Sequence, residues 1–155
     1  MIAKKSLELY KDIEFLFVFK PECYNDKYQK ISSERIKILK TTENFKMLLS
    51  AADIFFSFQN NKNSTLPPPL TWIEAMGMGI PILTTYAKGV EEIIEDMKNG
   101  FISPDIPGLI EKIRHIKEMD LSFISQNAIQ TIFNKFNLDY ITEQYFNSWE
   151  EVISE

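Results

Sequence analysis

Short apolar runs alternate with longer segments in which apolar residues recur every three or four positions, up to about residue 119. The short runs are rich in β-branched and aromatic residues, and several are apolar at nearly every position, as in FLFVF and DIFFSF. Such uninterrupted runs are typical of strands in a parallel sheet that helices cover on both faces. We expect strands at 14–19, 35–39, 53–58, 80–85 and 101–103.

The segments between these runs have the spacing of amphipathic helices. Thr71 and Glu74 have the spacing of a capping box, and Asn99 and Gly100 are typical of a helix end. We expect helices at 4–11, 43–52, 71–78, 90–98 and 106–119. After residue 120 we expect only helices, one that contains 124–136 and a last one at 140–152. This order predicts an α/β fold, a Rossmann-like parallel sheet with helices on both faces and a helical tail.

Length and composition limit the number of domains and the classes of partner and site that can be expected. The 155 residues suit one domain and are too few for two full α/β lobes. A net charge of -5 argues against a nucleic-acid partner. With one cysteine, Cys23, and one histidine, His115, neither an intrachain disulfide nor an ordinary zinc site is expected. The sequence carries no recognisable signal peptide or membrane span, so a cytoplasmic protein is expected.

The stretch from Asp53 to Pro104 carries several motifs in a fixed order: AADIFFSF, then LPPPLTWIEAMGMGIPILTTYAKGVEEII, then NGFISP. In this order they resemble the donor-binding domain of glycosyltransferase family 4, whose members have the GT-B fold of two facing Rossmann-like lobes. The resemblance implies that residues 1–155 are a single nucleotide-sugar-binding domain, the C-terminal half of a GT-B glycosyltransferase, without the N-terminal acceptor lobe. It further implies a retaining, hexosyltransferase-like enzyme acting on a glycan, lipid or other acceptor, with this half inactive alone.

The resemblance also implies a donor site at the carboxyl ends of the strands. Glu74 matches a glutamate that accepts hydrogen bonds from the ribose hydroxyls in the family, and a carboxylate can accept from both hydroxyls of a diol. Taken in isolation, Glu74 is explained about equally well as the partner of Thr71 in a capping box. Leu70 and Thr71 match positions whose backbone N–H groups face the donor diphosphate, where a helix N-terminus favours an anion.

Three further positions belong to the implied donor site. Lys40 and Thr41 fall in the loop where the family holds the nucleobase mainly through backbone groups. The alternative interpretation is that Thr41 or Thr42 only caps the next helix. Gly89 would serve the turn into the helix that lies beside the donor sugar. Glu92 matches an acid of the same element, and favourable charge at a helix start explains it at least as well as a substrate contact.

The chain departs from the family pattern at two places. Leu66 stands where the first motif glutamate is expected, and Pro67 and Pro69 replace glycines whose N–H groups would face a phosphate. The opening strand and its basic loop, which stabilise the leaving diphosphate in the family, are not recognisable. Lys4 and Lys5 are interpreted as surface charges of a helix rather than as that basic pair. No catalytic residue is assigned.

Two other interpretations stay open: a non-catalytic interaction module that keeps the fold, and an unrelated Rossmann-like domain. The second has less support, because Asp53 precedes its strand and no Gly-x-Gly-x-x-Gly follows the first strand. The expected ligand is a UDP- or GDP-sugar, with no cofactor and no metal ion. The expected partners are this nucleotide-sugar and the missing N-terminal lobe. Further candidates are a lipid acceptor at the inner face of the membrane and a second copy, because a missing strand would leave an apolar sheet edge.

Overall fold

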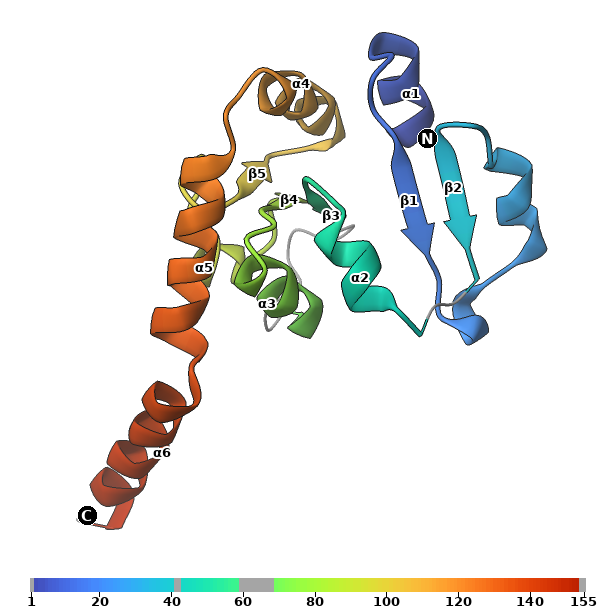
Figure 1. The fold of residues 1–155 in the computed structure, drawn as a ribbon. Coiled ribbons are helices and arrows are strands. Elements are labelled where there is room, and N and C mark those ends of the chain that lie inside the picture. The colour runs from blue at the N-terminus through green and yellow to red at the C-terminus, as the bar shows by residue number, and fades with distance from the viewer. Residues whose placement is uncertain (1, 41–42, 59–68, 154–155) are drawn as a thin grey trace.

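The computed structural model of the chain describes residues 2–40, 43–58 and 69–153. Within these ranges, five strands form two parallel sheets with six α-helices around them (Figure 1). The first sheet pairs β1 (Phe15–Val18) with β2 (Ile36–Leu39), and the second has the order β3 (Phe55–Ser57), β4 (Ile82–Thr85), β5 (Phe101–Ser103). Each strand lies within its predicted range, so the prediction of the strands is confirmed.

The α-helices largely follow the prediction as well. They are α1 (Ile2–Leu9), α2 (Phe45–Ser50), α3 (Leu70–Gly77), α4 (Ile106–Lys117), α5 (Ser122–Phe136) and α6 (Leu138–Ile153). Two short 3-10 helices, η1 (Pro21–Cys23) and η2 (Asp26–Ile31), connect β1 to β2 and were not predicted. The described residues include no helix with both the length and the apolar character of a membrane span.

The core lies on both faces of the three-stranded sheet. Ile82 and Leu83 are neighbours on β4, and their side chains point to opposite faces because strand side chains alternate. Ile82 belongs to a buried cluster with Trp72 and Met76 of α3, whereas Leu83 belongs to a second cluster with Leu109 of α4. Helices therefore cover both faces of this sheet, as the apolar strand pattern predicted.

The prediction of a helix at 90–98 is wrong. Only a 3-10 turn, η3 (Val90–Glu92), forms there. The side chain of Asn99 accepts a hydrogen bond from the N–H of Glu95 (2.8 Å) and donates one to the carbonyl of Ile93 (3.0 Å). Both backbone groups would otherwise join a helical ladder, and Met97 adopts a left-handed backbone with φ of 64°. Asn99 thus competes for the groups that a helix would use.

The helical tail is only partly packed. α5 contributes Ile124 and Ala128 to the core, but α6 has no buried residue and extends away from the rest of the molecule in Figure 1. Trp149 of α6 is 61% exposed and packs edge-on against Phe146. The apolar face of α6 is therefore largely uncovered.

Candidate functional site

The predicted donor site falls at the carboxyl ends of the strands. In the three-stranded sheet, Ser57 pairs with Thr84 and Thr85 pairs with Ser103, so the ends of β3, β4 and β5 lie at one edge. The segments that leave this edge carry the candidate residues. Loops and helix starts at such an edge are the usual place for a ligand in a parallel sheet.

The start of α3 carries backbone N–H groups that have no acceptor within the described part of the chain. Leu70 is the first helical residue and is 77% exposed despite its apolar side chain. Pro69 precedes it with an extended backbone, and its carbonyl accepts the N–H of Trp72 at 2.8 Å. The N–H groups of Leu70 and Thr71 have no hydrogen-bond partner among the described residues. A helix start of this kind favours an anion.

Glu74 lies one turn further along α3. Its side chain is exposed and makes no hydrogen bond or ion pair within the described part of the chain. Thr71 and Glu74 do not form the capping box that their spacing suggests. Pro69 occupies the N-cap position, and no side chain caps the helix. The alternative explanation of Glu74 is therefore removed, and its carboxylate faces solvent.

The other face of α3 is anchored. Trp72 is 2% exposed, and Ala75 and Met76 are fully buried. These residues pack in the cluster that includes Ile82 of β4, so the position of the helix is set by the core. The exposed carboxylate of Glu74 and the backbone N–H groups of Leu70 and Thr71 are therefore held on a rigid element before any ligand arrives.

Gly89 forms the turn that was predicted for it. Its φ of 95° is left-handed, and it immediately precedes η3. Beside the turn, Tyr86 donates a hydrogen bond to the carboxylate of Glu91, which raises the pKa of Tyr86 above its usual value. Glu92 does not begin a full helix as expected, and its backbone carbonyl accepts a hydrogen bond from Lys135 of α5 (2.9 Å).

Lys40 follows β2 in the other sheet. It is exposed, and its Nζ lies 5.3 Å from the ring centroid of Tyr24. Near it at the end of β1, the rings of Phe19 and Tyr28 stack at 4.7 Å between centroids. Sequence reasoning missed this aromatic group, for which the only signal was two tyrosines in the segment that follows β1. Aromatic faces at a strand end can stack with a planar ligand.

Some predicted positions cannot be placed. Thr41, Leu66 and Pro67 lie outside the described residues. Lys4 and Lys5 are exposed on α1, which is the surface position expected for them. Among the described residues, no group of three or more His, Cys, Asp or Glu side chains could hold a metal ion.

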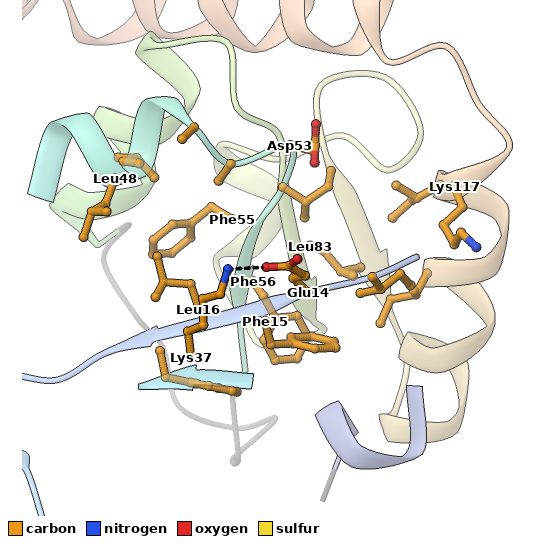
Figure 2. A pocket seen from close by; sticks show the side chains of 18 of the residues that line it. Glu14, Phe15, Leu16, Lys37, Leu48, Asp53, Phe55, Phe56, Leu83 and Lys117 are labelled. Atoms are coloured by element: carbon orange, nitrogen blue, oxygen red, sulfur yellow. Dashed lines mark hydrogen bonds and ion pairs between the residues drawn. The ribbon is translucent and has the colours of Figure 1, made fainter. Parts of the chain in front are cut away.

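The structure brings only part of the predicted site together. The start of α3, with Glu74, and the turn at Gly89 follow strands of the three-stranded sheet. Lys40 instead follows β2 of the two-stranded sheet. A cavity of about 830 Å³ lies between the two sheets, and none of the predicted site residues lines it (Figure 2). The candidate donor site is thus an open surface at the strand ends, distinct from this cavity.

Comparison with known proteins adds independent findings. A family model described as "Glycosyl transferases group 1" matches residues 2–118. The chain is 27% identical over 112 residues to the putative colanic acid biosynthesis glycosyltransferase WcaL of Salmonella typhimurium, and 26% identical to WcaL of Escherichia coli. Each match covers 68% of this chain and 28% of the relative. The chain therefore spans little more than a quarter of the curated relatives that it matches.

Solved structures agree on the fold. Anabaena Alr3699/HepE in complex with UDP-glucose superposes with a TM-score of 0.73 and 22% identity, over 97% of this chain and 44% of that chain. A glycosyltransferase from Rickettsia africae superposes with a TM-score of 0.77 and 18% identity, over 98% of this chain and 44% of that chain. At these identities the likeness concerns the fold, which matches one part of each longer structure.

Proposed function

Because the chain belongs to the glycosyl transferases group 1 family, we propose that residues 1–155 form the donor-binding half of a retaining glycosyltransferase. This half binds a nucleotide-diphosphate sugar, either a UDP- or a GDP-sugar. A second lobe outside these residues binds a glycan, lipid or other acceptor, so that activity requires both halves. The presence of UDP-glucose in the HepE structure supports a nucleotide-sugar as the ligand.

The observation that carries this proposal is the exposed start of α3. The N–H groups of Leu70 and Thr71 have no partner among the described residues, and an anionic diphosphate is favoured at such donors. The carboxylate of Glu74 is exposed one turn away and can accept hydrogen bonds from two ribose hydroxyls. A nucleoside diphosphate contains both groups, a diol and a diphosphate, at neighbouring positions.

The proposed chemistry assigns this half a binding and stabilising role. In glycosyl transfer, an acceptor oxygen forms a bond to the anomeric carbon and loses its proton. The bond between the anomeric carbon and the diphosphate breaks, and the diphosphate leaves with added negative charge. Aligned dipoles aimed at that charge lower the barrier. The N-terminus of α3 would supply such dipoles without a metal ion. The cations that compensate the diphosphate would come from polypeptide outside residues 1–155, and the second lobe would hold the acceptor.

The test is calorimetric titration of the chain with UDP, GDP and their common sugar conjugates, with ADP as the comparison nucleotide. Saturable binding of one nucleotide is expected, and Glu74→Ala should raise its Kd by roughly tenfold or more, because hydrogen bonds to a charged group contribute about 1.5–3 kcal/mol. Glu118→Ala is the matched control, since Glu118 is an exposed glutamate at the end of α4. An equal Kd in the Glu74 and Glu118 variants would contradict the site assignment.

One observation favours a second candidate function, a non-catalytic interaction module. Tyr145, Phe146 and Trp149 of α6 are each more than half exposed, and no residue of that helix is buried. Exposed apolar faces of this kind mark interaction sites. The same titration separates the two functions, because a module without donor binding would bind no nucleotide.

A further inference from the structure

One face of α5 is apolar although it is exposed to solvent. Phe123 and Phe133 are 66% and 67% exposed, and Ile129 between them is 45% exposed. The other outward positions of this face are also exposed and carry amide side chains: Gln126, Gln130 and Asn134. With 3.6 residues per turn, all six positions fall within about 140° of the helix circumference. We call these six residues the outer face of α5.

The outer face of α5 carries no charge, although a quarter of the residues of the chain are charged. Lys135 is the one charged residue of α5, and its Nζ donates to the carbonyl of Glu92 at 2.9 Å. The exposed side of α4, by contrast, carries charged residues such as Glu111 and Arg114. Depletion of charge together with exposed aromatic side chains is the composition of the centre of a protein interface.

The outer face lies away from the candidate donor site. α5 packs along α3 and forms one flank of the molecule in Figure 1. A Cβ on Gly79 would lie only 3.2 Å from Cδ1 of Ile129, so this isoleucine sits against the loop that leads into β4. That loop is at the amino ends of the strands, whereas the start of α3 is at their carboxyl ends. A lobe that shares a ligand with the start of α3 approaches the carboxyl ends and leaves the outer face uncovered.

The size of the outer face suits a weak but specific contact. Its two phenylalanines and Ile129 offer about 300–350 Å² of apolar surface per copy, if a whole phenylalanine side chain offers about 200 Å². A contiguous exposed patch of this size is often functional. With the amide side chains around it, a contact between two such faces would bury about 1,000–1,200 Å² in total, which reaches the lower limit for a specific interface.

The chemistry of the outer face favours a second copy of the same chain as its partner. A face without charge selects neither an acidic nor a basic partner, and it can meet itself although each chain has a net charge of -5. Each amide side chain carries both donors and an acceptor, so that amides on one copy can pair with amides on the other.

The spacing along α5 also matches the face to itself. Positions 123 and 133 are centred on 128, and so are positions 126 and 130. If two copies of α5 pack antiparallel across a two-fold axis at the level of residue 128, Phe123 of one copy lies opposite Phe133 of the other. Gln126 then lies opposite the partner's Gln130, and each contact occurs twice.

We propose that two copies of this chain associate through the outer face of α5, with the two helices antiparallel across a two-fold axis. The phenylalanines and Ile129 form the apolar centre, and the amide side chains pair beside it. The association is independent of the proposed donor binding, because the outer face contains no residue of the candidate donor site.

Sedimentation equilibrium over a range of chain concentrations tests the association. A reversible dimer with a Kd on the order of tens of micromolar is expected from the buried area. Phe133→Glu should raise this Kd roughly tenfold or more, because the contact would then bury an unpaired carboxylate. Phe146→Glu is the matched control, since Phe146 of α6 is 59% exposed and lies outside the outer face. This variant should leave the Kd unchanged.

A charge-pairing experiment tests the antiparallel arrangement. One chain carries Gln126→Glu with Gln130→Glu, and another carries Gln126→Lys with Gln130→Lys. Each should be monomeric alone, because like charges then face each other across the axis, and the mixture should form a one-to-one dimer. Circular dichroism checks that both chains keep their helices.

Three results would overturn the proposal. The first is a monomer at every concentration of the unsubstituted chain. The second is a dimer whose Kd is unchanged by Phe133→Glu, which would place the contact on another surface; loss of that dimer with Phe146→Glu would identify α6. The third is a mixture of the acidic and basic chains that associates no better than either chain alone.

Discussion

Replacing Asn99 with alanine should destabilise the domain although the substitution lies outside the proposed donor site. Asn99 is 2% exposed, and its side chain joins three segments. It accepts from the N–H of Glu95, and it donates to the carbonyl of Ile93 and to the hydroxyl of Thr131 on α5 at 2.9 Å. Alanine would remove all three hydrogen bonds and hold the segment after η3 less firmly.

The size of the effect follows from which groups lose their partner inside the protein. Ile93 is 1% exposed, so its carbonyl would be left buried without a donor, which costs about 1–3 kcal/mol. Glu95 is exposed, and its N–H can bond to water instead. Adding the bond to partly buried Thr131, at about 1 kcal/mol, gives a loss of about 2–4 kcal/mol in the free energy of unfolding. In a chain of this size that loss lowers Tm by roughly 5–15 °C.

Urea unfolding followed by circular dichroism measures this loss. Thr131→Val is the matched control, because it removes one partner of Asn99 and leaves both backbone bonds in place; it should cost about 1 kcal/mol. If Asn99→Ala destabilises the domain no more than Thr131→Val does, the backbone bonds of Asn99 do not hold this segment, and the explanation given for the missing helix is wrong.

Two further predictions concern the turn after β4. Gly89→Ala should destabilise the chain by about 1–2 kcal/mol, because φ of 95° is unfavourable for any residue with a Cβ; an unchanged Tm in differential scanning calorimetry would contradict this. The hydrogen bond to Glu91 raises the pKa of Tyr86 in the folded state above its ordinary value of 10.0. Its contribution to stability is therefore present below about pH 10 and is lost as the pH rises through the higher folded value, so Tyr86→Phe should flatten this alkaline loss in urea titrations.

The strands and most helices could be predicted because their signals are local. A run such as FLFV is apolar at each position and has the length of a buried strand, whatever lies next to it. Ile124 and Ala128 recur at helical spacing, and both are buried in α5. The motifs around Glu74 were sufficient to identify the family, since they depend on the order of residues and not on their contacts.

The errors arose where a local pattern has two solutions. Val90, Ile93, Ile94 and Met97 have the spacing of an amphipathic helix, but the side chain of Asn99 takes backbone groups that this helix needs. Likewise, Thr71 and Glu74 have the spacing of a capping box, yet the helix begins at Leu70, so that Thr71 lies inside the helix instead of at its cap. In both cases the spacing of the residues fits the predicted motif, and the backbone hydrogen bonds that form in the folded chain are different ones.

The sequence by itself therefore determined the strands, most of the helices, the fold class and the family, because apolar periodicity and motif order are properties of neighbouring residues. Only the tertiary structure decided that the strands form two sheets, that Phe19 stacks on Tyr28 and that an apolar cavity lies between β1 and β3. The physical reason is that strand pairing and burial depend on contacts between segments far apart in the chain. β1 has the composition of an interior strand, yet none of its residues is buried, because β2 is its only partner strand among the described residues.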